Sequence, residues 1–153
     1  MATKPVLKIR PVRIDEAEIL NTLMAALYQE DPGHTTFSPE KGTRTLSFLL
    51  NNSDMGRVLF LMSNRTIIGY VILVSYWSNE FGGLLLFIDE LFIKPDYRQQ
   101  GYGTQFFTDL SRIQPAGCVG WYLEHTAQNS RAANLYDRLG FKPHQNTVLI
   151  KIF

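Results

Sequence analysis

Two adjacent acids and a glycine-spaced turn lie within one stretch of the chain, residues 84–105. The stretch begins as an apolar run of strand length, and Asp89 and Glu90 interrupt it. A carboxylate in a buried strand costs free energy unless it is paired or does chemistry, and one beside a reacting group can take a proton from it. Because neighbouring strand residues face opposite ways, only one of the two acids points straight into a common site unless a bulge intervenes.

The turn after these acids has the composition of an anion-binding site. Arg98 stands three residues before Gly101, Gly103 follows, and residues 104–113 have the apolar face of a helix. Free N–H groups at a helix N-terminus, together with the helix dipole, favour phosphate. A P-loop would need a lysine after its second glycine, and a dinucleotide fingerprint would need a third glycine where Phe106 stands. The sequence therefore predicts a phosphate-binding turn of neither type.

These residues resemble a known family. Residues 98–103, Arg-Gln-Gln-Gly-Tyr-Gly, resemble the Arg/Gln-x-x-Gly-x-Gly/Ala signature of the GNAT superfamily of N-acetyltransferases. Residues 89–95 are similar to the fourth strand of that family, and most similar in kind to the diamine acetyltransferases. A second block, residues 129–141, resembles the family's Asn-x-x-Ala…Leu-Tyr…Gly-Phe helix. The resemblance covers residues 84–141 closely and implies an acetyl-CoA-dependent N-acetyltransferase.

The resemblance also assigns acetyl-CoA to particular positions. It implies that the backbone of residues 91–93 pairs with the pantetheine arm as another strand would, and that one N–H there stabilises the oxyanion. The amides of residues 99–104 are expected to bind the pyrophosphate, with added charge from Arg98, and Asn129 is expected to contact pantetheine. The predicted cofactor-binding residues are Leu91, Phe92, Ile93, Arg98, Gln99, Gln100, Gly101, Tyr102, Gly103, Thr104, Asn129 and Tyr136.

Three residues are predicted to move protons. An amine with a pKa near roughly 10 is mostly ammonium at neutral pH and must lose a proton before it attacks a thioester. The resemblance puts the proposed acid of the diamine acetyltransferases at Asp89 and their second acid at Glu90, and the sequence does not decide which is the base. It puts at Tyr136 a phenol that protonates the leaving thiolate. No acyl-enzyme is expected, because no serine or cysteine has a visible base partner.

Acids in the loops predict a cationic acceptor. By family geometry, the loop after the first helix and the loop at residues 77–83 flank the acceptor pocket. The predicted acceptor-site residues are Tyr28, Glu30, Asp31, Glu80 and Glu124. They favour a polyamine-like or other small cationic amine. Two alternatives stay open, a protein N-terminal or lysine acetyltransferase and a non-catalytic acyl-CoA-binding sensor. A nucleotide-binding module is disfavoured, because nothing resembles a base or ribose reader.

Composition limits the class of protein. The chain of 153 residues is 45% hydrophobic and 19% charged, typical of one globular domain covering residues 1–153. A net charge of +1 argues against a dedicated nucleic-acid binder. One cysteine, Cys118, excludes an internal disulfide, and three scattered histidines do not suggest a metal site. Residues 1–8 lack a signal-peptide core and no apolar run spans a bilayer, so a cytoplasmic protein is expected.

The elements that must position these residues follow from hydrophobic periodicity. Strands are predicted at residues 6–10, 57–62, 66–76, 84–93, 119–124 and 147–153, and helices at about 15–29, 38–50, 104–113 and 130–139. The order β-α-α-β-β-β-α-β-α-β predicts an α/β (α+β) fold with a mixed, mostly antiparallel sheet and helices on both faces. The resemblance further implies that the fourth and fifth strands splay apart around pantetheine. It also implies a homodimer, often formed through the C-terminal strands.

Overall fold

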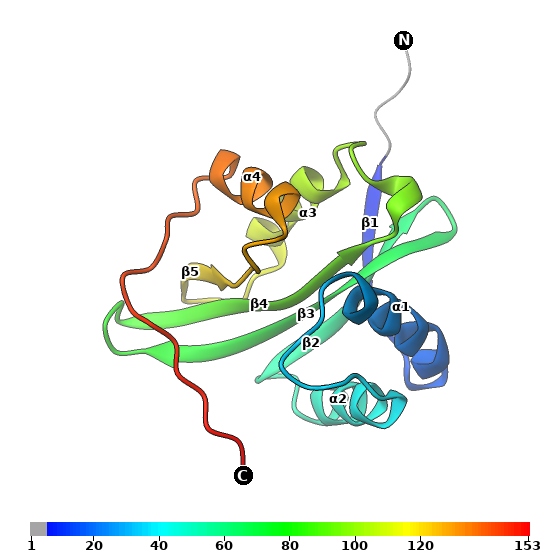
Figure 1. Ribbon diagram of the computed structural model, residues 1–153, viewed down its shortest axis with the longest axis horizontal. Coiled ribbons are helices and arrows are strands. Elements are labelled where there is room, and N and C mark those ends of the chain that lie inside the picture. The colour runs from blue at the N-terminus through cyan, green and yellow to red at the C-terminus, as the bar shows by residue number, and fades with distance from the viewer. Residues whose placement is uncertain (1–5) are drawn as a thin grey trace.

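A computed structural model describes residues 6–153 and shows one sheet with helices on both faces (Figure 1). The strands are β1 (Leu7–Pro11), β2 (Gly56–Ser63), β3 (Thr66–Ser78), β4 (Gly83–Ile93) and β5 (Cys118–Leu123). The helices are α1 (Ala17–Glu30), α2 (Pro39–Asn51), α3 (Tyr102–Ile113) and α4 (Ser130–Arg138), with short 3-10 helices η1 (Ile14–Glu16) and η2 (Pro95–Tyr97). The first part of the segment judged to lack a signal peptide, residues 1–5, lies outside the described residues. No helix in residues 6–153 is long and apolar enough to cross a membrane.

The sheet has the strand order β1-β2-β3-β4-β5. The first four strands pair antiparallel, and β5 pairs parallel to β4. Short turns join β2 to β3 and β3 to β4, whereas α1 and α2 lie between β1 and β2. The parallel pair needs a crossover, which α3 provides. The predicted mixed, mostly antiparallel sheet is confirmed.

Two hydrophobic clusters hold the helices to the sheet. On one face, Leu20 of α1 and Leu46 of α2 pack with Phe60 of β2. On the other face, Phe106 and Leu110 of α3 pack against the sheet, and α4 lies over the same face. All five of these side chains are fully buried, and burial of each contributes roughly 1.5–3 kcal/mol. The predicted helices on both faces are confirmed.

A β-bulge at Asp89 divides β4 into two parts. Ile88 is opposite Leu73 and Glu90 is opposite Ile72, so Asp89 has no partner on β3. An extra residue of this kind bends a strand and redirects the side chains around it. The bulge supplies the condition under which both acids can approach one site.

The bulge also changes which face each side chain takes. Before it, Leu86 and Ile88 pack in the cluster under α3. After it, Phe92 packs in the cluster under α1 and α2, and Leu91 contacts the α3 side. In a regular strand, all even-numbered residues would share one face. The bulge thus moves Glu90 to the face that α1 covers.

The strands β4 and β5 separate in the middle of β4. Their pairing begins at Leu84 opposite Cys118 and ends at Ile88 opposite Leu123. β4 continues to Ile93, and β5 stops. The splay implied by the family resemblance is therefore confirmed, and it leaves one edge of residues 91–93 without a strand partner in the described chain.

The predicted final strand, residues 147–153, is wrong. The chain after α4 contains no helix or strand, and it runs away from the sheet to the C-terminus (Figure 1). Its apolar side chains are exposed, with Leu149 at 89%. A strand exists only when its N–H and C=O groups meet a partner, and alternating apolar residues cannot supply one. The observed order therefore ends with α4.

Candidate active site

A cavity of about 470 Å³ lies where β4 and β5 have separated. Four segments form its walls: the end of α1, the second half of β4, the turn into α3, and α4 with the loop before it. Every predicted cofactor-binding residue except Gln100 lines this cavity. The Gln100 amide instead donates to the Asp96 carbonyl within the turn, at 2.8 Å. Elements far apart in the sequence therefore converge on one elongated site.

The turn into α3 presents backbone N–H groups to the cavity. Gln99 and Gly101 have φ values of 60° and 88°, in the left-handed region, and such conformations help turn N–H groups toward an anion. The first N–H that α3 itself pairs is that of Gln105, which donates to the Gly101 carbonyl at 3.0 Å. The N–H groups of residues 102–104 are therefore left for an external acceptor. This geometry suits a phosphate group.

Two residues explain why α4 can approach this turn closely. A Cβ added at Gly103 would lie 3.0 Å from Leu135 Cδ2, so a larger side chain would push α4 away. Asn129 caps α4, because its Oδ1 accepts from the Ala132 N–H at 3.2 Å. Its side chain thus builds the helix end that borders the cavity.

Arg98 is held by three contacts within the protein. Its Nε donates to the Ile93 carbonyl at 2.7 Å, and its guanidinium lies 5.5 Å from the centre of the Phe92 ring. Its Nη2 forms an ion pair with Glu30 at the end of α1, at 2.7 Å. The arginine therefore ties α1 to β4. Its charge is already matched by Glu30, which the pattern of the turn alone could not reveal.

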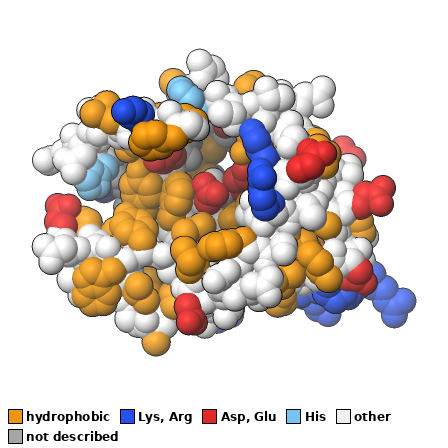
Figure 2. All heavy atoms as spheres, turned by 90° about the horizontal axis from the view of Figure 1, so that it is seen from below, with side chains coloured by type: hydrophobic (Ala, Val, Ile, Leu, Met, Phe, Trp, Pro, Cys, Tyr) orange, Lys and Arg blue, Asp and Glu red, His pale blue; other side chains and the backbone are white. Residues whose placement is uncertain are grey.

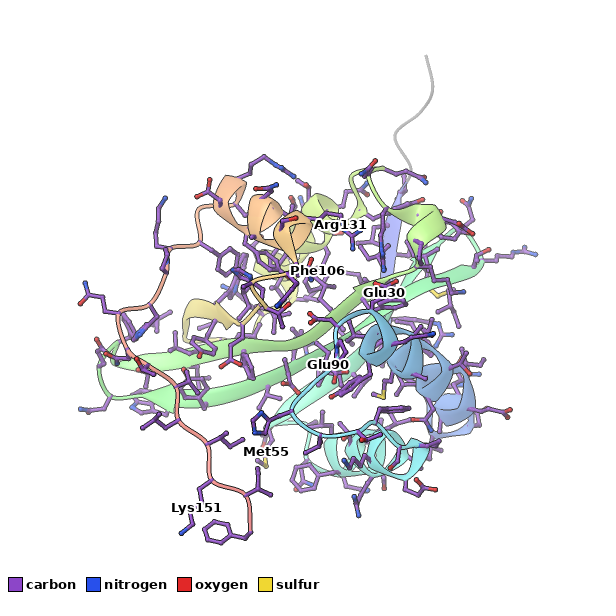
Figure 3. The ribbon with its side chains drawn as sticks, in the orientation of Figure 1. Glu30, Met55, Glu90, Phe106, Arg131 and Lys151 are labelled. Atoms are coloured by element: carbon purple, nitrogen blue, oxygen red, sulfur yellow. The ribbon has the colours of Figure 1, made fainter. Side chains whose placement is uncertain are left out.

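Two further arginines, Arg131 and Arg138, line the same cavity from α4. Figure 3 shows Arg131 on the α4 side of the molecule. Neither forms an ion pair with a residue in the described part of the chain. Sequence reasoning did not select them, although they are seven positions apart and a helix puts such positions on one face.

Tyr136 of α4 lines the cavity and is half-buried. Its ring packs against Phe107 at 6.0 Å and Phe141 at 5.7 Å between ring centres. Burial, and to a lesser extent the charge of Asp31, raises the pKa of the phenol. Tyr136 therefore keeps its proton at neutral pH and is available as a donor.

Asp89 has an unusually basic carboxylate for an aspartate. The pKa of Asp89 is raised to about 6, first by burial within the body of the protein and then by the charges of Glu90 and Glu124. Its side chain nevertheless stays accessible to solvent. Figure 2 shows acidic side chains inside a hollow bordered by hydrophobic ones. A carboxylate in this setting can take and release a proton near neutral pH.

Glu90 has a different environment. Tyr28 of α1 donates its OH to Oε1 at 2.8 Å, and Tyr70 of β3 donates its OH to Oε2 at 2.7 Å. Figure 3 shows Glu90 beside the end of α1. Burial, together with the Glu90 charge, raises the pKa of both phenols, so they remain donors. Tyr70 was missed by sequence reasoning, because one tyrosine in an apolar strand reads as core.

The other predicted acceptor-site residues lie at different places in the structure. Glu124, just after β5, is close enough to raise the pKa of Asp89 and accepts from the Tyr122 OH at 2.8 Å. Asp31 lines the cavity, with Glu30, and accepts from the Thr126 OH at 3.0 Å. Glu80 lies in the exposed turn before β4, about 20 Å along the strand from Asp89 at roughly 3.3 Å per residue. A role for Glu80 at the acceptor stays a prediction from the sequence.

A family model described as "Acetyltransferase (GNAT) domain" matches residues 54–143, more than half of the chain. The chain belongs to the GNAT acetyltransferase family. The match includes the bulged strand, the turn into α3 and the cavity-lining part of α4. The family resemblance read from the two sequence blocks is confirmed.

Individual proteins are similar to this chain in sequence or in fold. The chain is 28% identical over 72 residues to thialysine N-epsilon-acetyltransferase from Sus scrofa, a match that covers 46% of this chain and 40% of that protein. The chain thus spans less than half the length of this relative. A possible acetyltransferase from Clostridium difficile 630 shares the fold with a TM-score of 0.79 and 18% identity, over 97% of this chain and 99% of the other. The aminoglycoside N-acetyltransferase AAC(6')-Iy, solved with CoA, has a TM-score of 0.77 and 18% identity, over 99% and 98%.

Proposed function

We propose that this GNAT protein transfers the acetyl group of acetyl-CoA to a primary amine of a small cationic molecule. The observation that carries the proposal is one continuous arrangement. A cavity edged by unpaired N–H groups at the start of α3 extends past residues 91–93 of β4 to Tyr136. The basic carboxylate of Asp89 lies on β4 as well. An anionic cofactor with a long arm fits such a site, and an acid beside it suits an ammonium acceptor.

The residues around the cavity fit acetyl-CoA, which supplies an activated acetyl thioester when bound. The N–H groups of residues 102–104 would receive the pyrophosphate, and Arg131 and Arg138 would add positive charge. The free edge of residues 91–93 would pair with the pantetheine amides, because β5 no longer occupies it. Arg98 would hold the turn in place through Ile93 rather than carry the charge alone.

Two residues would move the protons. Asp89 would accept a proton from the acceptor ammonium, so that the amine lone pair can attack the thioester carbonyl and form the new C–N bond. Tyr136 would donate its phenolic proton to the sulfur as the C–S bond breaks. The raised pKa of each group matches its role, since Asp89 becomes a better base and Tyr136 remains protonated. Both are restored by exchange with solvent.

A cationic acceptor is supported by the charges around Asp89. Glu90 and Glu124 lie near it, and no lysine or arginine in residues 6–153 forms an ion pair with any of the three acids. Like charges held together favour an incoming cation. The names of two similar proteins, the thialysine and aminoglycoside acetyltransferases, also describe transfer to amines. We therefore favour a polyamine-like acceptor over a peptide.

The test is amine-dependent release of the CoA thiol. Purified protein is given acetyl-CoA with polyamines, aminoglycosides, amino acids, N-terminal peptides or lysine peptides. We expect release with small cationic amines and little without an acceptor. Release with peptides alone would favour the protein acetyltransferase alternative. Tight CoA binding by calorimetry with no release on any amine would contradict the enzyme proposal and favour a sensor.

A homodimer is proposed on a separate observation. The tail after α4 is exposed and apolar, at Leu149, Ile150 and Ile152 among others. In the described chain, β5 pairs only with β4, so its other edge is open. An extended apolar segment can add to such an edge, and we propose that the tail of a second copy does so. A cytoplasmic location stays a prediction from the sequence.

Light scattering after size exclusion tests the dimer. The chain is expected to elute as a dimer. A variant with Leu149, Ile150 and Ile152 all changed to serine is expected to elute as a folded monomer. A monomeric wild type would contradict this proposal and leave the acetyltransferase proposal intact.

A further inference from the structure

The helix α3 begins without a capping side chain. Its N-cap is Gly101, which has no side chain to accept from the first N–H groups of the helix. A capping side chain would occupy one of the N–H groups that the proposed phosphate site uses. The glycine leaves these groups available, but the first turn of α3 then lacks the contact that usually fixes a helix start. Other contacts must hold this turn in place.

Two side chains of the first turn of α3 bond to one place on the sheet. The hydroxyl groups of Tyr102 and Ser63 share a hydrogen bond at 2.6 Å, and Gln105 Oε1 accepts from the Leu7 N–H at 2.9 Å. Leu7 of β1 and Ser63 of β2 are opposite each other in the strand register. Positions three apart lie on the same face of a helix. One point of the sheet thus holds both positions of this turn.

The Tyr102 side chain is fixed by packing as well as by its hydroxyl. It is 3% exposed and belongs to the hydrophobic cluster that contains Phe106. Its ring lies 6.3 Å from that of Tyr97 in η2, just before the turn. A hydroxyl on a buried ring needs a hydrogen-bond partner, and Ser63 supplies it. One side chain therefore connects the segment before the turn, the start of α3 and the end of β2.

These contacts hold the backbone that borders the cavity. Residues 102–104 line the cavity, and their N–H groups are the ones left without a partner inside α3. A backbone N–H binds a phosphate oxygen well only when it points at that oxygen, because hydrogen bonds weaken steeply with angle. A site that is ordered in advance also loses less freedom on binding. A hydroxyl bonded to Ser63 can therefore influence cofactor affinity through the backbone.

We propose that Tyr102 and Ser63 are positioning residues for the cofactor, and that their hydrogen bond holds the first turn of α3 where its N–H groups meet the pyrophosphate. The inference rests on the proposed function, in which acetyl-CoA is the acetyl donor. It gives the Tyr102 phenol a role apart from that of its backbone. It also adds Ser63, 39 positions earlier in the chain, to the residues that determine CoA affinity.

The test compares acetyl-CoA with acetyl-pantetheine, which has the same thioester and arm but no pyrophosphate. The readout is kcat/KM for each thioester in the wild type, Tyr102→Phe and Ser63→Ala. Each variant is expected to lower the acetyl-CoA value about 3- to 10-fold, through KM more than kcat, as for loss of one neutral hydrogen bond. The acetyl-pantetheine value should stay unchanged. Equal losses with both thioesters would indicate a general structural defect and overturn the proposal.

Gln114→Met is the matched control, because it removes a contact from the other end of α3. There, Trp121 Nε1 donates to Gln114 Oε1 at 2.8 Å. This variant is expected to preserve the ratio of the two kcat/KM values. An equal fall of the ratio in Gln114→Met and Tyr102→Phe would overturn the proposal, because any loosening of α3 would then suffice.

The double variant that combines Ser63→Ala with Tyr102→Phe tests whether the hydrogen bond itself is responsible. Both changes remove the same bond, so the double variant should lose no more acetyl-CoA kcat/KM than either single variant. Losses that multiply would show that the two hydroxyl groups act separately, and would contradict a shared positioning role.

Calorimetric titration of CoA separates this proposal from the proposed function. Weaker CoA binding in Tyr102→Phe than in the wild type and Gln114→Met would support the positioning role even if no amine is acetylated. Equal CoA binding by Tyr102→Phe and the wild type would overturn it even if acetylation is observed.

Discussion

The two sides of β4 are built by different means. On the side proposed for the cofactor, backbone groups face the cavity, from the edge of residues 91–93 and the N-terminus of α3. On the side proposed for the acceptor, side chains do so, with Asp89 on the bulge and Glu90 between Tyr28 and Tyr70. Cofactor binding would therefore depend on glycines and local geometry. Acceptor binding would depend on residues that only the tertiary structure brings together.

The largest effect is expected from Asp89→Asn, which removes the base and keeps the shape of the bulge. Turnover should fall about 10²- to 10⁴-fold, the usual range for loss of a general base. CoA affinity should stay at the wild-type value, because Asp89 does not line the cofactor cavity. Steady-state kinetics and calorimetry measure the two quantities. A large loss of CoA affinity would mean that the two sides of β4 are not separate.

Tyr136→Phe is expected to have the next largest effect. It removes the donor hydroxyl and keeps the ring that packs against Phe107 and Phe141. Turnover should fall roughly 10- to 100-fold, toward the lower end for general acid catalysis. CoA affinity should change little. Turnover equal to that of the wild type would remove Tyr136 from the proton-donor role.

Gly101→Ala should impair the cofactor side alone. Gly101 has a φ of 88°, and a residue with a Cβ costs roughly 1–2 kcal/mol in this region. The strained turn should present its N–H groups less well, so CoA affinity should fall about 10-fold, the equivalent of 1.4 kcal/mol. The control is Gly82→Ala in the turn before β4, with a φ of 65° and open space around the added Cβ.

Both glycine variants should lose similar thermal stability, and only Gly101→Ala should bind CoA more weakly. Equal CoA affinity in the two variants would mean that the turn geometry is not used for the cofactor.

The pH dependence of kcat/KM should separate the two acids. Asp89 must be ionised to accept a proton and its pKa is raised to about 6, so activity should fall as the pH drops through about 6. Part of the shift comes from Glu90 and a smaller part from Glu124. Glu90→Gln should therefore move the fall in activity to lower pH, and Glu124→Gln should move it less. An unshifted profile in Glu90→Gln would contradict the charge coupling.

The smallest effect is expected from Glu30→Gln, which frees the Arg98 charge. The ion pair at 2.7 Å is partly exposed, so its loss should cost about 1 kcal/mol or less of folding free energy. The freed guanidinium could then approach phosphate, so CoA affinity should rise by a few-fold at most. Calorimetry at two salt concentrations measures this. Weaker CoA binding would mean that Glu30 positions Arg98 for the cofactor.

The sequence predicted which residues around the α3 turn share one cavity, and the reason is physical. A phosphate-binding turn is made by consecutive residues, so Gly101, Gly103 and the start of α3 can be read from spacing alone. The hydrophobic periods of helices and paired strands are equally local. Both the sheet order around β4 and the splay of β5 were therefore predictable, the second only with the family resemblance.

The acceptor side could not be predicted in the same way. The partners of Glu90 are Tyr28 and Tyr70, which lie 62 and 20 residues away along the chain. The ion pair of Arg98 with Glu30 spans 68 residues. The predicted strand 147–153 failed for a related reason, because pairing depends on a partner that the segment itself does not contain. Contacts of this kind become visible only in the folded chain.

Amine-dependent release of the CoA thiol by Asp89→Asn at saturating acetyl-CoA tests the division between the two sides of β4 most directly. The prediction is that the variant binds CoA as tightly as the wild type and releases thiol at least about 100-fold more slowly. Release at the wild-type rate, with CoA binding intact, would show that the carboxylate on the bulge is not the base and would contradict the account.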